Sequence, residues 1–274
     1  MFDKMFYLTA IAVLVIIADM IFEVNFPIIR EVNIDTEKIE KGKEIVFLQI
    51  SDFHGSSSVE LVNKMVSKAD KIKPDAVFIT GDLVDETTKD FDNIHILIKK
   101  LYSICSDIFF VSGNHEWNND KKTELLRKLK ELGVKISNNK GFNFAIRGTD
   151  INICGVDDSY RGQDNIEKAM KSADNKNYII LISHSPKIRD RLRGHSPDLI
   201  ISGHTHGGQV RLPLIGAIIS PVEGLFPKYD KGIYKLNNGS ILYIDSGVGT
   251  SKLPIRFLNR SQMSLIKIVG TGRD

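Results

Sequence analysis

Histidine and aspartate gather in five short stretches of this chain, although histidine occurs only seven times in 274 residues. The stretches are SDFHG (Ser51–Gly55), TGDLVD (Thr80–Asp85), SGNHE (Ser112–Glu116), SHS around His184, and SGHTHGG (Ser202–Gly208). Carboxylate, amide and imidazole groups bind borderline to hard divalent ions such as Mn, Zn or Fe, and no cysteine accompanies them. The set therefore indicates a metal centre built without thiolates.

Each stretch follows an apolar segment with the length and composition of a buried β-strand. These segments cover 43–50, 75–80, 107–112, 178–183 and 198–202. Open α/β sheets collect their ligands at the carboxyl ends of the strands, so we expect the polar side chains to meet at one rim. Five glycines beside the stretches let the backbone turn sharply there: Gly55, Gly81, Gly113, Gly203 and Gly207.

The spacing of apolar residues predicts an α/β half followed by a β-rich half. Helical periodicity covers 59–72, 91–104 and 123–133, and these helices alternate with the first three strands. Beyond Val134 shorter strands dominate, at 142–146, 151–156, 178–183, 198–202, 208–212, 232–236, 241–245 and 263–268. Two mixed β-sheets packed face to face and flanked by helices fit this order better than one doubly wound sheet. We therefore predict an α/β fold, a four-layer α-β-β-α sandwich with the metal site at the carboxyl ends of its strands.

Composition limits the class of protein. A net charge of +3 without a long Lys/Arg block argues against nucleic-acid binding, and 42% hydrophobic residues predict a folded chain. Cys105 and Cys154 lie far apart in apolar runs, so we expect buried free thiols rather than a disulfide framework. We expect the protein to be a monomer.

The N-terminal stretch FYLTAIAVLVIIADMIF (Phe6–Phe22) is apolar except for Thr9 and Asp19. As a helix it would be about 25 Å long, at the short end of a membrane span. We predict an uncleaved signal anchor here. A cleaved signal peptide and a buried core helix are the alternatives, although Lys4 is the only positively charged residue before the apolar stretch and no small-x-small cleavage site follows.

The chain is accordingly divided into three parts. Residues 1–24 form the anchor, residues 25–43 a polar linker, and residues 44–274 one catalytic domain. The charges that flank the apolar stretch favour a cytoplasmic N-terminus. We therefore expect a single-pass protein of the cell membrane with an extracytoplasmic catalytic domain.

The polar stretches together resemble a known family, the calcineurin-like metallophosphoesterase superfamily. The resemblance is carried by five motifs in order: Asp52-Phe-His54, Gly81-Asp82-Leu-Val-Asp85, Gly113-Asn114-His115-Glu116, His184, and Gly203-His204-Thr-His206. GHTHGGQVRLP and the late motif SGVGTSKLPIRFLNR (Ser246–Arg260) further resemble the membrane-associated single-domain phosphohydrolase branch. That branch usually carries a Pro-Glu-like pair where this chain has Ser261-Gln262.

The resemblance implies two divalent metal ions, with Mn expected first and Zn or Fe as alternatives. The first ion would be held by Asp52, His54 and His206 and the second by Asn114, His184 and His204, with Asp82 bridging the two. Ions about 3.5–4 Å apart can clamp a phosphate and activate a bridging hydroxide as the in-line nucleophile. His115 would be the acid for the leaving group, oriented by Asp85. The sequence indicates no role for Glu116.

Each of these residues alone has an ordinary explanation. Asp or Asn after a strand usually forms a turn or caps a helix, and a single histidine such as His184 can be structural. Five spaced motifs rarely agree by accident, so we assign them jointly to the site. We place His95 and His195 outside it. Asp157 and Asp158 follow a predicted strand and could approach the site, but we expect them to form a turn.

The segment PLIGAIISPVEGLFP (Pro213–Pro227) follows the last predicted ligands. It is either a hairpin that covers the core or an apolar lip that holds the site near acyl chains. Together with the anchor it favours a phosphohydrolase that cleaves a phosphodiester or pyrophosphate bond of a lipid-linked or cell-envelope substrate. The alternatives are a phosphodiesterase of soluble nucleotides and a non-catalytic metal-binding scaffold. A scaffold would be expected to lack a ligand or the His115–Asp85 pair, and this chain has both.

Overall fold

The computed structural model describes residues 2–55, 58–220, 224–250 and 254–272. Its first sheet has six strands in the order β1-β15-β2-β3-β4-β5. Their bounds are β1 (Ile28–Glu40), β15 (Gln262–Gly272), β2 (Glu44–Ile50), β3 (Ala76–Ile79), β4 (Ile108–Phe110) and β5 (Lys135–Ile136). Strands β2 to β5 are parallel, whereas β15 runs antiparallel to β2 and parallel to β1.

A second six-stranded sheet is formed by the later part of the chain, in the order β13-β14-β9-β8-β7-β6. Its strands are β13 (Gly232–Lys235), β14 (Ile241–Ile244), β9 (Leu199–Ser202), β8 (Tyr178–Ile182), β7 (Thr149–Gly155) and β6 (Lys140–Ile146). The four central strands are parallel and both edge strands pair antiparallel. Both sheets are thus mixed, as predicted.

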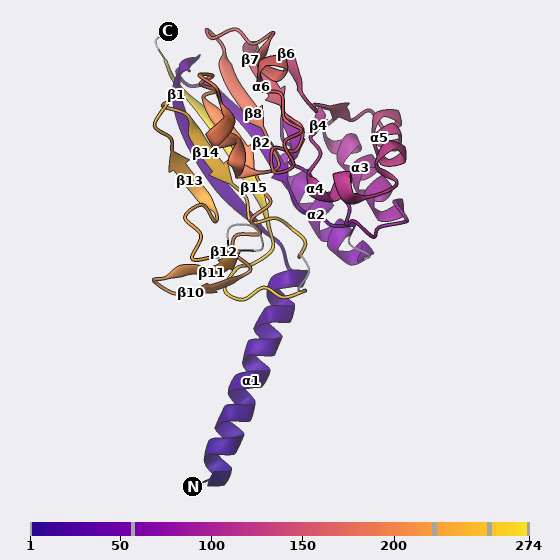
Figure 1. Cartoon of the computed structure of the whole chain (residues 1–274), viewed down its shortest axis with the longest axis vertical. Helices are drawn as coiled ribbons and strands as arrows, with labels where there is room; N and C mark the ends of the chain where they lie inside the picture. Colours follow the sequence, from indigo (N-terminus) through magenta and orange to yellow (C-terminus); the bar gives the residue numbers. More distant parts are fainter. Residues whose placement is uncertain (1, 56–57, 221–223, 251–253, 273–274) are drawn as a thin grey trace.

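Helices cover the outer faces of both sheets. The first sheet packs against α2 (Val59–Ile72), α3 (Asp92–Ile104) and α5 (Lys122–Glu131), and the second packs against α6 (Ile166–Met170) and the 3₁₀ helix η1 (Pro186–Arg191). Between the sheets lies a third apolar cluster, which joins Phe47, Phe78 and Phe109 to Ile153 and Ile180. The predicted α-β-β-α layering is confirmed (Figure 1).

Helix α2 illustrates why the local prediction succeeded. The Ser58 side chain accepts a hydrogen bond from the Leu61 backbone N–H and so caps the helix start. Leu61, Val62, Met65 and Ala69 are buried on one face against the first sheet. Lys73 ends the helix in a left-handed conformation.

The predicted linker over 25–43 is wrong, because most of it is the 13-residue edge strand β1. Val32, Ile34 and Ile39 are buried, while the residues between them face solvent. Because one face of this edge strand is exposed to solvent, its average composition is polar. The alternation of apolar and polar residues that marks a strand was therefore missed in the sequence. Its partner β15 lies at the other end of the chain.

Helix α1 (Phe2–Asn25) projects away from the domain (Figure 1). Its segment Lys4–Asn25 has mean hydropathy 2.4, long and apolar enough to cross a membrane, and its most apolar window is 0% buried. A core helix would be covered by the domain, so the core-helix alternative is wrong.

Residues 210–225 contribute a small third sheet of β10 (Val210–Leu212), β11 (Gly216–Ser220) and β12 (Gly224–Leu225). Residues 221–223 of the apolar Pro213–Pro227 segment lie outside the described residues, as do 251–253 of the late motif. In the described part of the segment Leu214, Ile215 and Phe226 are exposed, so these side chains face outward instead of covering the core. Cys105 and Cys154 are free and buried, as expected.

Candidate metal centre

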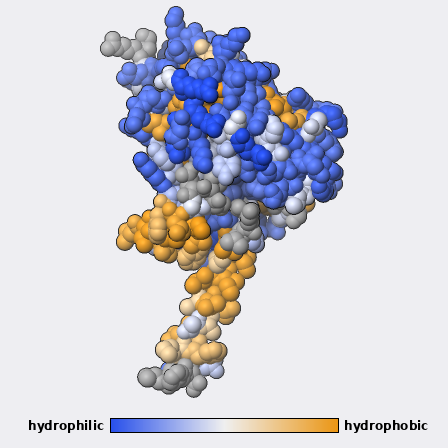
Figure 2. All heavy atoms as spheres, viewed as in Figure 1, coloured by the Kyte–Doolittle hydropathy of each residue, from blue (hydrophilic) through white to orange (hydrophobic). Residues whose placement is uncertain are grey.

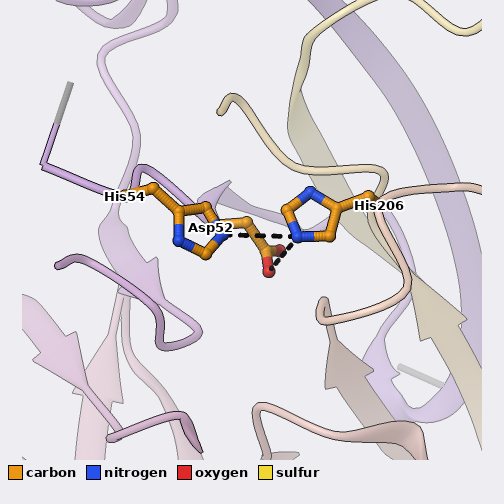
Figure 3. A group of neighbouring side chains, drawn as sticks. All are labelled: Asp52, His54 and His206. Carbon is orange, nitrogen blue, oxygen red and sulfur yellow. Dashed lines mark hydrogen bonds and ion pairs between the residues drawn. The ribbon is translucent and has the colours of Figure 1, made fainter. Parts of the chain in front are cut away.

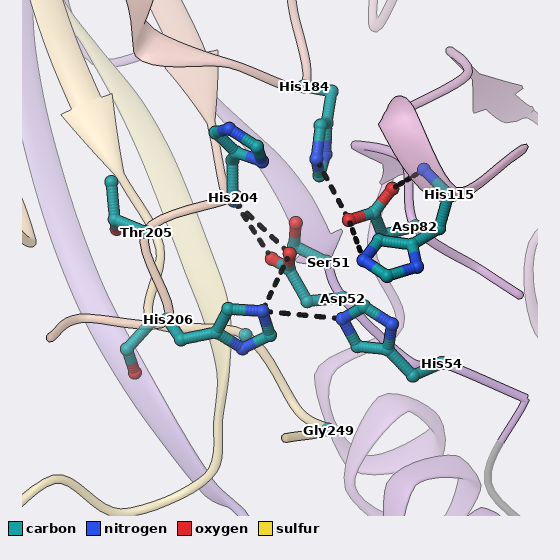
Figure 4. A network of polar contacts seen from close by, with 12 residues as sticks. Ser51, Asp52, His54, Asp82, His115, His184, His204, Thr205, His206 and Gly249 are labelled. Atoms are coloured by element: carbon teal, nitrogen blue, oxygen red, sulfur yellow. Dashed lines mark hydrogen bonds and ion pairs between the residues drawn. The ribbon is translucent and has the colours of Figure 1, made fainter. Parts of the chain in front are cut away.

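The carboxyl ends of five parallel strands meet at one rim. Strands β2, β3 and β4 of the first sheet run into Asp52, Asp82 and Asn114, and β8 and β9 of the second run into His184 and His204. Because the sheets pack face to face, the two sets of polar side chains approach each other across the rim (Figure 4). The short helix α4 (Asn114–Asn118) begins there.

Asp52, His54 and His206 form one group whose ligand atoms lie within 4.8 Å of one another (Figure 3). Nε2 of His54 is 3.3 Å from Nε2 of His206, and the latter is 3.6 Å from Oδ1 of Asp52. All three side chains are nearly inaccessible to solvent. These are the three residues predicted for the first ion.

Asp82, His184 and His204 form a second group of the same size. Nε2 of His184 faces both Oδ2 of Asp82 at 3.1 Å and Oδ1 of Asn114 at 3.2 Å. The backbone N–H of His204 donates to both carboxylate oxygens of Asp52, at 3.2 and 3.1 Å, and so links the two groups. The residues predicted for the second ion are therefore also brought together.

Figure 4 shows the Asp82 carboxylate of the second group beside the rings of His184 and His115. Its Oδ1 accepts the His115 backbone N–H at 2.9 Å, while its Oδ2 is 3.9 Å from Nε2 of His115. Oδ2 of Asp85 is 3.7 Å from Nδ1 of His115 and 3.9 Å from Nδ1 of His54. These separations exceed a hydrogen bond, so Asp85 stands beside both rings without bonding either.

The backbone at these positions is unusual. Asp52, His54, Asp82, His204 and His206 all have φ between 50° and 72°. Non-glycine residues in this left-handed region cost about 1–2 kcal/mol each, and such strain concentrates at functional sites. The turn explains how His204 and His206, two positions apart, can direct their rings into different groups.

The donor set fits a pair of cations. Nδ1 of His184 lies 2.8 Å from the carbonyl oxygen of Thr80 and donates its proton there, so Nε2 is aimed at two oxygen atoms. Nε2 of His204 is buried and meets no hydrogen-bond partner among the described residues. Converging acceptors without donors are the arrangement that a metal ion satisfies.

The electrostatic environment of the histidines also favours metal binding. Burial lowers the pKa of His54 to about 4 and of His206 to about 3, and lowers that of His204 well below its usual value. Neutral imidazoles are the form that binds metals. Burial also opposes charge on His184, but the Asp82 and Asp52 carboxylates outweigh it and raise its pKa to about 10. The same two carboxylates would attract a cation bound beside Nε2 of His184.

Glu116 has a role that sequence reasoning missed. Its buried carboxylate accepts backbone N–H groups of Asp82 (2.9 Å), Leu83 (2.6 Å), Val84 (3.2 Å) and Gly113 (2.6 Å). It thereby ties the loop that carries Asp82 to the start of α4. Burial and the Asp82 carboxylate raise the pKa of Glu116 to about 7, against the lowering effect of these bonds. The only available signal was its place three residues after Gly113.

A second missed element joins the centre to α1. The Asn259 backbone N–H donates to Oε2 of Glu23 at 2.7 Å, and the Asn259 side chain donates to the carbonyl oxygen of His206 at 2.7 Å. Behind this loop the buried Arg256 guanidinium donates to the carbonyl oxygens of Ser246 and Gly247. Residues far apart in sequence make these bonds, so no local pattern could reveal them.

The remaining candidates lie as expected. Asp158 accepts the Tyr160 and Arg161 backbone N–H groups, which makes it a turn former, and Asp157 accepts the Trp117 indole N–H. His95 is exposed on α3. His195 follows η1, and its backbone bonds to Leu192.

Comparison with known proteins gives consistent matches. A family model described as calcineurin-like phosphoesterase matches residues 45–208, which include every predicted metal-binding position. An uncharacterized metallophosphoesterase of Aquifex aeolicus is 32% identical over 268 residues, covering 91% of this chain and 95% of the relative. An uncharacterized metallophosphoesterase of Helicobacter pylori (strain J99) is 33% identical over 251 residues, 89% of this chain but only 64% of the relative. The chain thus spans less than two thirds of that relative's length.

Among solved structures, a 5'-nucleotidase precursor from Thermus thermophilus has the same fold, with a TM-score of 0.51. The match covers 83% of this chain and 54% of that one at 14% identity. A likeness at this identity concerns the fold alone.

Proposed function

Since this chain belongs to the calcineurin-like phosphoesterase family, we propose that it is a membrane-anchored, dinuclear-metal phosphohydrolase that cleaves a phosphodiester or pyrophosphate bond of a lipid-linked substrate. The observation that supports the chemistry is the pair of donor groups at one rim, Asp52/His54/His206 and Asp82/His184/His204. Asn114 adds an amide oxygen to the second group. We assign Asp82 the bridging position because it belongs to the second group and its charge also acts on His54 and His206 of the first.

Two divalent cations held there would polarise the phosphoryl oxygens and lower the pKa of a water molecule. Manganese is our first expectation, with zinc or iron as alternatives. The protein's own contribution is positioning. Glu116 holds the Asp82 loop against α4, and the Asp52 carboxylate is fixed by the His204 backbone N–H.

We assign His115 as the acid that protonates the leaving group. Its ring is 15% exposed and packs at right angles to His54, with ring centroids 4.7 Å apart. It therefore borders the centre and can still reach a substrate. We assign Asp85 to orient this ring by charge rather than by a hydrogen bond, since its carboxylate lies 3.7 Å from Nδ1.

The lipid-linked substrate class rests on the contact between the centre and α1. Asn259 bonds both Glu23 in the last turn of α1 and His206. If α1 spans the bilayer, the rim lies close to the membrane surface, where a phosphate attached to an acyl-bearing group would be presented. We place the domain on the extracytoplasmic side and expect a monomer.

The function is tested by assaying the full-length protein in vesicles after chelation and after Mn²⁺ addition. Bis-p-nitrophenyl phosphate serves as the soluble diester, CDP-diacylglycerol as the lipid-linked pyrophosphate and ADP-ribose as a soluble nucleotide pyrophosphate. We expect Mn-dependent hydrolysis with preference for the lipid-linked compound. Preference for ADP-ribose would favour the soluble-nucleotide alternative, and metal binding without hydrolysis of any probe would favour the scaffold.

A further inference from the structure

The β10–β12 sheet, the residue directly after it and the loop before β15 expose a group of large apolar side chains, called here the apolar platform. It consists of Leu214, Ile215, Ile219, Leu225, Phe226 and Leu258, with exposed fractions from 45% to 108%. Figure 2 shows a dense apolar surface beside the domain end of α1, while the rest of the visible domain surface is largely hydrophilic. Soluble monomers rarely expose apolar side chains so closely grouped, and such patches mark interaction surfaces.

The backbone of the platform holds these side chains outward at a cost. Leu214, Phe226 and Leu258 have φ of 67°, 50° and 51°, in the left-handed region that disfavours large residues. None of the three is buried in return. Strain that core packing does not offset indicates a function for the exposed side chains.

The platform is tied to the end of α1. Strand β10 and the residue before it bond to the loop that carries Leu258. The Arg211 N–H donates to the Phe257 carbonyl oxygen, and the Phe257 N–H donates to the Gln209 carbonyl oxygen, both at 3.0 Å. One residue after Leu258 the same loop reaches α1, where Asn259 bonds Glu23. The platform and the last helical turn therefore belong to one connected surface.

Basic groups lie where that turn leaves the apolar part of the helix. The Arg260 guanidinium stacks over the Phe22 ring at 4.5 Å, and the Lys64 ammonium lies 3.8 Å from the centroid of Phe26. A helix of this length extends about 36 Å, so its last turn falls at the headgroup level of a bilayer whose apolar core is about 30 Å thick. Cations at that level complement anionic phospholipid headgroups.

We propose that the apolar platform is a bilayer-docking surface, which inserts its side chains into the interfacial region of the same membrane that α1 crosses. Docking adds a second attachment beside the helix, so the domain is held in one orientation rather than tethered loosely. The inference rests on the proposed function only through the membrane anchor. It requires no particular substrate.

Depth measurement by spin labelling tests the proposal directly. Leu214→Cys is labelled in the full-length protein, with Ala145→Cys on β6, at the end of the domain away from α1 (Figure 1), as the matched control. The native cysteines are buried and stay unlabelled. The protein is reconstituted into vesicles of phosphatidylethanolamine and phosphatidylglycerol, and insertion of α1 is verified by carbonate extraction.

At Leu214→Cys we expect molecular oxygen to relax the label more than a water-soluble nickel complex does, and at Ala145→Cys the reverse. If the protein resists carbonate extraction and the nickel complex reaches both labels equally, the docking proposal is overturned. The membrane anchor is not contradicted by that result. A label that is immobilised in detergent, together with a doubled mass by light scattering, also overturns it, since the platform would then bind a second copy.

A functional arm separates docking from catalysis. Leu225→Glu with Phe226→Glu should leave hydrolysis of bis-p-nitrophenyl phosphate unchanged and lower hydrolysis of CDP-diacylglycerol in vesicles several-fold. Tyr102→Glu, which changes an exposed aromatic residue on α3, is the matched control and should alter neither. Equal losses on both substrates would contradict docking, whereas a wild-type protein inactive on both would defeat the proposed function and leave the depth measurement valid.

Discussion

The carboxylates of Asp82 and Glu116 lie close enough to influence each other's charge, yet their partners differ. Burial opposes charge on Asp82, but the neighbouring His184 ring, followed by the rings of His54 and His115, outweighs it and holds the pKa of this carboxyl below its usual range. The carboxylate of Glu116 instead accepts four backbone N–H groups. At the residue scale the first carboxylate is available for metal binding and the second is committed to holding a loop.

Asp82→Ala and His115→Ala should therefore separate binding from turnover. We expect Asp82→Ala to lose metal at one or both sites, because a shared carboxylate offsets charge on both ions. His115→Ala should keep its metal and lose about 10²–10⁴-fold in kcat, as expected for a general acid. The measurements are metal content by mass spectrometry and rates on diesters with good and poor leaving groups. Equal losses on both diesters would argue against His115 as the acid.

Glu116→Gln tests the loop-holding role. The glutamine amide places N–H donors against backbone donors, so we expect the free energy of unfolding to fall by about 2–3 kcal/mol. Metal retention should fall as well, since the Asp82 loop is released. Glu124→Gln, on the exposed surface of α5, is the control and should stay within about 0.5 kcal/mol of the parent protein in urea unfolding. A Glu116 variant as stable as this control would refute the role.

At the scale of helices and strands, the carboxyl ends of the strands and the last turn of α1 meet at the rim. Five strands deliver ligand-bearing loops, and the last turn of α1 supports one of them through Glu23, which is only 8% exposed. The Ser261 backbone N–H also donates to the Glu23 carbonyl oxygen at 2.9 Å. A chain cut near Asn25 would lose both acceptors. Any soluble form should therefore begin before Glu23.

Glu23→Ala in the full chain should loosen the His206 loop without removing the helix. We expect weaker retention of the metal held by Asp52, His54 and His206, measured by competition with a chelator. Glu23→Gln keeps an oxygen that accepts the Asn259 N–H, so it should restore most of the retention. If the two variants behave alike, the Glu23 side chain does not position the loop.

In the whole molecule the apolar helix extends from a largely polar domain, and the apolar platform lies beside the point where it does so (Figure 2). This separation of surfaces supports the proposed membrane anchor, because lipid stabilises an apolar helix and water stabilises a polar domain surface.

We predict that the full chain remains with membranes after high-salt and carbonate washes. Orientation follows from Ala145→Cys, the exposed position on β6. A membrane-impermeant maleimide should label it in intact cells, because we expect the domain to be extracytoplasmic. The parent chain is the control and should stay unlabelled, since its cysteines are buried. Labelling only after cell lysis would place the domain on the cytoplasmic side, and release by carbonate would contradict anchoring.

The sequence by itself determined the types of the candidate metal-binding residues, their order and their positions after apolar strands. It could do so because each ligand is local: a buried strand of a few residues ends, and the next residues must lie at the sheet edge. The same locality made α2, α3 and α5 predictable from apolar spacing. The layer architecture followed from the order of these elements.

Only the tertiary structure decided the features that depend on distant partners. Residues 28–40 became a strand because β15 lies beside them, and their own composition indicated a linker. Glu116 acquired its role from backbone groups of another loop, and Glu23 bonds a residue 236 positions away. Whether Pro213–Pro227 covers a core or faces outward likewise depended on what packs against it. Composition describes a segment's own preferences, whereas burial and pairing are properties of its neighbours.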